Sequence, residues 1–331
     1  MHLHNVSRML SGHMVGSIRA AAERIAAEKT YIRIDDAKLI ALAVSLKDRP
    51  IPAWDNGLHF FDGGPKSVMY TLLLDAVNFC FWPSVFVTEY QGKRYGLEDG
   101  YCALSVALKR AFEEGIPLWD PTFLTQIDVK TLKNILRFDG DICLLEERAA
   151  NARNLGETLV KKYHGDPSTL LAEAGHDAAR LADLLAADFD CYRDERVWRG
   201  ETFAVMKRAQ ICASDLAGSF NAGGVVRLTG AEKLTCFADY KLPQLFHADG
   251  VFVYSADVEK RILAQELIPE NSEEEVAIRA NTILVVERLK KEIAALGREI
   301  SAREIDWLLW DESITPGRLN VPHHRTLTTA Y

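Results

Sequence analysis

Apolar residues recur at helical spacing along most of the chain. In "SIRAAAERIAAEK", for example, Ile18, Ala22 and Ile25 form one stripe, with charged residues opposite it. The same spacing predicts helices over residues 35–48, 66–82, 101–115, 129–138, 144–163, 167–189, 194–220, 273–297 and 301–312. Residues 66–82 are apolar nearly all round, which is typical of a central helix buried on most sides. The sequence therefore predicts a mainly α protein, with more turns in residues 194–246 than elsewhere.

One segment alternates between apolar and polar residues. Residues 84–98, "SVFVTEYQGKRYGLE", turn at Gln91-Gly92-Lys93, and this pattern predicts a small β-hairpin. No repeat and no long Pro/Gly/Ser linker divides the chain. We expect a helical N-terminal segment, residues 1–30, followed by a single helical domain, residues 31–331. The chain has no GxGxxG or GxxxxGK[ST] motif, which disfavours the α/β nucleotide-binding folds.

The composition is ordinary for a soluble globular protein, with 48% hydrophobic and 26% charged residues among 331. A net charge of −8 disfavours a polynucleotide-binding surface, although one local basic group would suffice for a small nucleotide. The six cysteines have neither CxxC nor zinc-ligand spacing, which is typical of a reduced intracellular protein. Neither a signal peptide nor an apolar run of the roughly 20 residues that a membrane span needs is present. We therefore expect a cytoplasmic protein.

A single carboxylate interrupts the apolar run "LTCFADYKLPQLF", residues 234–246. Asp239 follows Cys236 and Phe237 closely, and an ionised side chain is costly to bury unless it is paired, hydrogen-bonded or used. Phe237 and Asp239 share a face if the segment is extended. That arrangement suits a site that stacks a flat ring and acts at its glycosidic carbon. The alternative is that Asp239 caps a helix beginning near Pro243, and the pattern alone favours neither.

A second unusual segment is "REIDWLLWDESI", residues 303–314. Asp306 lies four residues before Trp310. Trp307 and Asp311 have the same spacing, so a helix here would carry two carboxylate–indole pairs. Indoles can stack on a base, and carboxylates accept hydrogen bonds from a guanine-like edge. The more frequent arrangement is a core-facing Trp pair with solvated acids.

Three other sets of polar residues are weaker candidates. His59 lies in the turn-rich segment "WDNGLHFFDGG", where ligand contacts often arise, although a structural hydrogen bond is the commoner role of a lone His. Lys207 and Arg208 form a basic pair that could bind one phosphate, and the alternative is a solvated helix face. Asp75 and Asn78 would share a face of a buried helix, so we expect them to bond to each other or to nearby backbone, not to catalyse.

Residue patterns alone thus predict a helical protein with several acids in unusual places, but no reaction. Seven segments taken together do resemble a known family, the queuosine salvage proteins. In chain order these segments are "DAVNFCFWPS", "ALKRAFEEGIPL", "LLEERAANARNLGETL", "MKRAQICASDL", "TCFADYKLPQLF", "EVAIRANTI" and the ending "WLLWD … HHRTLTTAY". The resemblance covers nearly the whole chain, from about residue 35 onward. Collinear segments of this number are far more specific than one short motif.

The resemblance implies an activity and a fold. Members of this family are queuosine 5′-phosphate N-glycosylases/hydrolases, so the chain is expected to cleave the N-glycosidic bond of queuosine 5′-monophosphate and release queuine for reuse in tRNA. It also implies a largely helical fold similar to that of DNA glycosylases, with no metal and no organic cofactor. The expected partner is this small nucleotide, without direct polynucleotide binding, and the oligomeric state is left open.

The family's functional residues map onto positions of this sequence. Its "FADY" aspartate, the nucleophile or transition-state stabiliser, corresponds to Asp239. The substrate-binding positions implied by the resemblance are His59, Cys236, Phe237, Asp306, Trp307, Trp310 and Asp311, with Lys207 and Arg208 assigned to the 5′-phosphate. One departure is Met206, where relatives carry a Tyr before the Lys-Arg pair; it bears on one ligand contact and not on the reaction.

Chemistry supplies a reason for the buried acid. Breaking a ribosyl C–N bond gives the sugar oxocarbenium character, and a carboxylate in a site of low dielectric acts strongly on such a centre. The alternative is a non-catalytic protein that binds a modified nucleotide or tRNA. A third option, removal of bases from DNA, rests on fold analogy alone. The acidic net charge disfavours both tRNA binding and the removal of bases from DNA.

Overall fold

Helices make up most of the structure, as the sequence predicts. The computed structural model describes residues 14–54, 57–96, 99–224 and 226–331. The α-helices in these ranges are α1 (Met14–Ala26), α2 (Asp36–Leu46), α3 (Pro65–Ala76), α4 (Gly100–Glu113), α5 (Pro121–Leu124), α6 (Val129–Leu136), α7 (Leu145–Tyr163), α8 (Pro167–Glu173), α9 (Ala178–Asp188), α10 (Lys207–Gly223), α11 (Lys241–Ala248), α12 (Ala256–Leu263), α13 (Glu273–Ala295) and α14 (Ala302–Ser313). The prediction of a mainly α fold is confirmed. Residues 1–13 of the expected N-terminal segment lie outside the described ranges.

The strands are short and form three small antiparallel sheets. β1 (Ile32–Ile34) pairs with β7 (Phe252–Tyr254). β2 (Phe86–Tyr90) pairs with both β3 (Lys93–Tyr95) and β4 (Asp139–Gly140). β5 (Glu195–Trp198) pairs with β6 (Glu201–Ala204). The predicted hairpin is confirmed as β2–β3, with its turn at Gln91-Gly92, and its expected last residues, 97–98, lie outside the described part.

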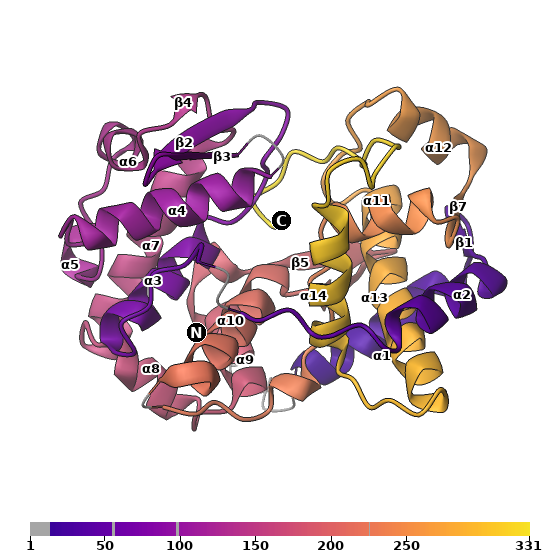
Figure 1. Cartoon of the computed structure of the whole chain (residues 1–331), viewed down its shortest axis with the longest axis horizontal. Helices are drawn as coiled ribbons and strands as arrows, with labels where there is room; N and C mark the ends of the chain where they lie inside the picture. The colour runs from indigo at the N-terminus through magenta and orange to yellow at the C-terminus, as the bar shows by residue number, and fades with distance from the viewer. Residues whose placement is uncertain (1–13, 55–56, 97–98, 225) are drawn as a thin grey trace.

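Two groups of helices lie on either side of the middle of the molecule (Figure 1). Helices α3–α8 and the β2–β4 sheet form one group, and α1, α2 and α11–α14 form the other, with α10 between them. The C-terminal segment also ends near the middle. The backbone N–H of Cys80, after α3, donates to the carbonyl of Tyr331, and the guanidinium of Arg279 on α13 lies over the Tyr331 ring. The end of the chain therefore connects the two groups.

Three predicted helices differ from the structure. The helix expected over residues 66–82 ends at Ala76, so that residues 77–82 are irregular. The helix expected over 167–189 is divided into α8 and α9 by Gly175 and His176, both with positive φ. The helix expected over 194–220 begins only at Lys207, because residues 195–204 form the β5–β6 hairpin.

A buried ion-pair network supports the central helices. Both Arg279 guanidinium nitrogens donate to the Asp194 carboxylate, at 2.8 and 2.6 Å, and Arg196 pairs with Glu275 at 3.0 Å. Burial alone would raise the pKa of Asp194, but the charges of Arg279 and Arg196 outweigh it and hold that pKa well below the ordinary value. The Asp194 side chain also accepts a hydrogen bond from the backbone N–H of Lys207, at 3.0 Å. The network thus fixes the first turn of α10.

Candidate active site

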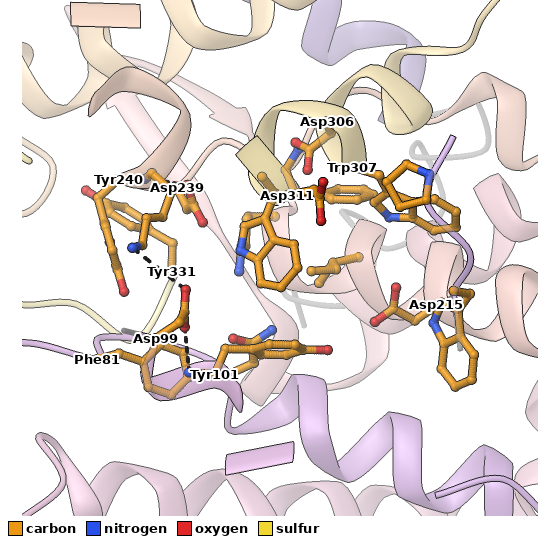
Figure 2. Close-up of a pocket in the computed structure, with 18 of the residues that line it drawn as sticks. Phe81, Asp99, Tyr101, Asp215, Asp239, Tyr240, Asp306, Trp307, Asp311 and Tyr331 are labelled. Carbon is orange, nitrogen blue, oxygen red and sulfur yellow. Dashed lines mark hydrogen bonds and ion pairs between the residues drawn. The ribbon is translucent and has the colours of Figure 1, made fainter. Parts of the chain in front are cut away.

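A cavity of about 290 Å³ is lined by residues from both groups of helices and from α10. Its walls come from α10, α14, the N-terminal end of α4, the segment before α11, residues 52–54, His59 and Tyr331. Figure 2 shows carboxylates on several sides of this space, with Asp239 and Asp215 on opposite sides in this view and Asp306 between them. The cavity brings together seven of the residues expected from the sequence: Asp239, Phe237, Asp306, Trp307, Trp310, Asp311 and His59. Lys207 lines it as well.

Asp239 both faces the cavity and receives hydrogen bonds from the start of a helix. The backbone N–H groups of Lys241 and Leu242 donate to its Oδ1, at 2.7 and 3.4 Å. Helix α11 begins at Lys241, two residues before the proline that the sequence suggested as its start. The two interpretations of Asp239, helix cap and site carboxylate, are therefore compatible. Helix N–H groups and the positive end of the helix dipole stabilise a negative charge at this position.

The extended segment that carries Asp239 is fixed by three helices. Gln210 on α10 accepts from the Thr235 backbone N–H at 2.8 Å. Asp306 on α14 accepts from the Phe237 N–H at 2.8 Å, and Arg279 on α13 donates to the Ala238 carbonyl at 3.1 Å. Since each bond holds a different backbone group, the position of the neighbouring Asp239 is set by the surrounding helices and not by a mobile loop.

Asp306 is nearly buried, with 4% of its surface exposed, and it differs from Asp239 in its environment. Burial raises the pKa of the Asp306 carboxyl to about 7; the hydrogen bond from Phe237 opposes this rise, and the negative charge of Asp239 adds to it. Asp306 is therefore suited to hold a proton near neutral pH. The sequence alternative of solvated acids beside core indoles does not describe this helix, because Trp307 and Trp310 are only half-buried and line the cavity.

Asp311 lies nearer the solvent than Asp306. Its carboxylate is 3.9 Å from the Arg49 guanidinium, and its side chain is 54% exposed. Trp310, one residue earlier, meets the Tyr101 ring edge-to-face with centroids 5.8 Å apart. One turn of α14 thus offers the cavity an indole and an exposed acid.

Lys207 is the cavity's buried cation, at 4% exposure. Burial lowers the pKa of its ammonium group, and the negative charges of Asp239, Asp75 and Asp306 oppose that effect. A positive charge here therefore lies among several carboxyl groups.

Arg208 and Cys236 do not line the cavity. Successive helical residues point about 100° apart, so Arg208 faces away from Lys207. Its guanidinium donates to the Ala76 carbonyl at 2.7 Å and lies over the Phe79 ring. Cys236 is 1% exposed and packs in the core. Met206, at the departure from the family pattern, is also buried in the core.

His59 belongs to the aromatic side of the cavity. Its Nε2 lies 2.8 Å from the Tyr101 hydroxyl, and its ring stacks on Trp54 with centroids 4.6 Å apart. The ring also meets the edge of Tyr70. In this position His59 orients Tyr101 and Trp54, both of which line the cavity.

Several lining residues were not predicted from the sequence. Asp99 caps α4 by accepting from the Tyr101 N–H at 2.8 Å, and its carboxylate lies 3.7 Å from the Lys241 ammonium. Asn78, Tyr101, Asp215, Tyr240, Lys241 and Tyr331 are further polar lining residues. The only signal for Asp215 is an acid in the otherwise small and apolar run "ICASDLAGS", where Lys207, Ile211 and Asp215 have i, i+4, i+8 spacing.

Within the described ranges, no three His, Cys, Asp or Glu side chains are grouped so as to hold a metal ion. The same part of the chain contains no helix with the length and apolar character needed to cross a membrane. Paired carboxyl groups, a lysine and stacking rings can together bind a heterocyclic nucleotide and act on a charged transition state.

Comparison with known proteins gives consistent matches. The family model described as "Queuosine salvage protein" matches residues 58–331. A protein of Sphaerobacter thermophilus named queuosine 5′-phosphate N-glycosylase/hydrolase is 40% identical over 306 residues, which cover 92% of this chain and 94% of that protein. Proteins of the same name from Schizosaccharomyces pombe and Mus musculus are 32% and 30% identical and cover 88% and 79% of this chain, and 89% and 81% of their own lengths.

Proposed function

The chain belongs to the queuosine salvage protein family, and we propose that it is a hydrolase that cleaves the N-glycosidic bond of queuosine 5′-phosphate and releases queuine. One observation carries the proposal beyond family membership. Asp239 and Asp306 face one cavity in different environments: Asp239 accepts backbone N–H groups at the start of α11, and burial raises the pKa of Asp306 to about 7. Two carboxyl groups that differ in environment and in role are typical of enzymes that cleave glycosidic bonds.

In the proposed mechanism, Asp239 acts at the sugar. As the C–N bond lengthens, positive charge develops at the anomeric carbon, and the adjacent carboxylate stabilises that charge or attacks to form a ribosyl ester. Water then adds at the same carbon, displacing the Asp239 carboxylate where an ester has formed. The water loses a proton, which replaces the one given to the departing base. The fixed backbone around Asp239 matters because a preorganised charge needs no rearrangement in the transition state. Its half-buried position strengthens the interaction by excluding much of the solvent.

Asp306 is proposed to act on the departing base. In a 7-deazaguanine, position 7 is carbon, so the base cannot be activated by protonation there and must be neutralised along its pyrimidine ring. Asp306 Oδ2 is already bonded to the Phe237 N–H, which leaves Oδ1 to carry a proton for the base. Trp307, Trp310 and Phe237 offer ring faces for stacking, and Asp311 can accept from N–H groups at the outer end.

The 5′-phosphate has two candidate anchors among the lining residues, Lys207 and Lys241. The sequence suggested Lys207 together with Arg208, but the Arg208 guanidinium donates to the backbone carbonyls of Asp75 and Ala76 at the end of α3. Lys241 lies beside Asp239 in sequence, with a side chain 17% exposed and paired with Asp99. We propose that Lys241 holds the phosphate, because it is the more exposed of the two lysines. Lys207, which is buried, balances the charge of the carboxyl groups.

The test is multiple turnover. Purified protein is mixed with a tenfold or greater excess of queuosine 5′-monophosphate, and free queuine is followed by chromatography. Release of several equivalents of queuine per protein is expected. A protein that binds at most one equivalent of nucleotide and leaves it intact would instead be the non-catalytic binding protein.

A further inference from the structure

The face of α10 that lines the cavity runs from the reaction centre to its far end. Lys207, Ile211 and Asp215 lie four residues apart and all line the cavity. Eight residues of α-helix span about 12 Å along the axis. Lys207 lies among the carboxyl groups of Asp239 and Asp306, so Asp215 marks a part of the cavity well beyond the sugar (Figure 2).

Asp215 forms no ion pair with a Lys or Arg side chain in the described part of the chain. It is 5% exposed, and within the described ranges no Lys or Arg nitrogen lies within 4.0 Å of its carboxylate. The nearest cationic side chain on α14, Arg303, donates to the Ser214 hydroxyl at 3.4 Å and lies over the Trp307 ring. Burial, and then the charge of Asp75, raise the pKa of Asp215 well above its ordinary value. The charges of Lys207 and Arg303 and the contact with the Trp54 side chain lower this pKa but do not offset the burial. A further positive charge close to the carboxyl would favour its ionised form.

Aromatic rings line the cavity at this end, and the Trp54 side chain contacts the Asp215 carboxyl. Trp54, Tyr101 and Trp307 line the same cavity. Gly218, three residues after Asp215 on α10, makes room for two of them: a Cβ there would lie 2.9 Å from Trp54 Cδ1 and 3.1 Å from Trp307 Cη2. Only glycine lets both indoles approach the helix so closely. A carboxyl group close to indole rings is an arrangement that can bind an organic ammonium group, because the carboxylate supplies the opposite charge and the rings supply cation–π contacts.

We propose that Asp215, with Trp54 and Trp307, forms the subsite for the cationic substituent of the base, the secondary ammonium group that queuine carries on the methylene at ring carbon 7. This inference rests on the proposed function. The reacting carbon lies at the Asp239 end, and the substituent extends from the opposite side of the base, toward Asp215. Pairing supplies the charge that lets the carboxyl ionise, so the subsite selects a cationic substituent over a neutral one.

The experiment compares two substrates in two proteins. The substrates are queuosine 5′-monophosphate and 7-deazaguanosine 5′-monophosphate, which has hydrogen at ring carbon 7, and the proteins are native and Asp215→Asn. We expect the variant to lose at least about 30-fold in kcat/KM for queuosine 5′-monophosphate, since a buried charge partner is removed. For 7-deazaguanosine 5′-monophosphate we expect a change of less than about threefold, because it makes no such pair. Equal losses on both substrates, or no loss on either, would overturn the proposal.

A second variant and a second readout keep the test decisive. If Asp215→Asn does not fold, Trp54→Leu replaces it, with a selective loss of about threefold to thirtyfold expected for the amine-bearing substrate. If native protein releases no base from either nucleotide, the proposed function fails, and the subsite is judged by binding of the free bases. Native protein must then bind queuine more tightly than 7-deazaguanine, and the variant must lose that preference; equal affinities would refute the subsite independently of catalysis.

Discussion

At the scale of single residues, the proposed chemistry depends on the hydrogen bonds and the burial of two carboxyl groups. Asp239 Oδ1 receives two backbone N–H groups, whereas Asp306 receives one and is otherwise enclosed. Two acids close together resist carrying two negative charges. In our account Asp239 acts at the sugar and Asp306 acts as the carboxylic acid, and each is placed by backbone contacts that a conservative substitution leaves in place.

The first prediction concerns pH. The Asp306 pKa of about 7 lies above the ordinary value, so its proton is held below pH 7 and lost above it. If Asp306 donates that proton, kcat falls as pH rises through about 7. Asp306→Asn should lower kcat and remove this alkaline limb, as measured by initial rates from pH 5 to 9.

Asp75 provides the control, because burial raises its pKa to about 7 as well and it does not line the cavity. Asp75→Asn should keep the limb. A limb that persists in Asp306→Asn, or disappears in Asp75→Asn, contradicts the assignment of the acid.

The second prediction concerns the phosphate. Lys241→Gln removes the cation proposed to meet the 5′-phosphate but keeps a side chain of similar length. The native preference for queuosine 5′-monophosphate over unphosphorylated queuosine, measured as a ratio of kcat/KM values, should fall about tenfold or more, as expected for loss of a charge-assisted hydrogen bond. Lys233→Gln, an exposed lysine paired with Asp177, should leave the ratio unchanged. An unchanged ratio in Lys241→Gln would contradict this assignment and favour Lys207 as the residue that contacts the phosphate.

The site residues that the sequence revealed are those with a conspicuous local pattern. An acid in an aromatic run marked Asp239, and acid–indole spacing marked Asp306 and Trp310. Asp99 and Asp215 could not be found in this way, because a helix cap and a lone helical acid are common everywhere, and only the packing of α4 and α10 turns these two toward one cavity. The orientation of Arg208 likewise depends on the register of α10.

At the scale of elements, periodicity predicted the helices well and their ends poorly. Residues 77–82 continue the apolar pattern of α3, yet the helix stops at Ala76, and the Asn78 amide donates to Asp75 Oδ1 at 3.2 Å within the irregular segment. Asn78 lines the cavity from this segment. The hairpin β5–β6 was missed because its alternation over 195–204 is short and adjoins a strong helical pattern.

The third prediction concerns the contact between two helices. Gly156 on α7 lies against α5, and a Cβ there would be 2.5 Å from the Pro121 carbonyl oxygen and 2.7 Å from Leu124 Cβ. Although alanine gains about 1 kcal/mol in helix propensity, Gly156→Ala should destabilise the protein by about 1–3 kcal/mol, because α5 must move away. Denaturant unfolding measures the change.

Gly223→Ala is the matched control. Gly223 is also helical, and the one contact found for an added Cβ among the described residues beyond its own helix is Phe61 Cε1 at 3.8 Å, an ordinary distance. This variant should be neutral or slightly stabilising. Comparable destabilisation of both variants would mean that the close approach of α5 and α7 is not the reason for glycine at position 156.

At the scale of the whole molecule, Arg279 connects the walls of the cavity. It donates to Asp194, which holds the start of α10, and to the carbonyl of Ala238, beside Asp239. Its guanidinium also lies 4.6 Å from the centre of the Tyr331 ring, and Tyr331 lines the cavity. Sequence patterns showed "EVAIRANTI" as a matching segment, but the partners of its arginine lie at distant positions along the chain, so only the fold reveals them.

The fourth prediction follows from that burial. Arg279→Met leaves the Asp194 carboxylate buried with only part of its compensation, so the free energy of unfolding should fall by about 3 kcal/mol or more. Arg94→Met breaks the exposed pair with Asp139 and should cost less than about 1 kcal/mol. Equal and small losses in both variants, measured by denaturant unfolding, would show that the buried network contributes little.

The central claim is that the Asp239 carboxylate drives cleavage of the glycosidic bond. The most direct measurement compares native protein, Asp239→Asn and the exposed control Asp257→Asn in single-turnover release of queuine from queuosine 5′-monophosphate, with nucleotide affinity measured separately. We predict that Asp239→Asn binds the nucleotide but releases queuine about a hundredfold or more slowly, the usual effect of removing a transition-state charge, and that Asp257→Asn matches native protein. Release by Asp239→Asn at the native rate would contradict the account and leave Asp239 with its role at the start of α11 alone.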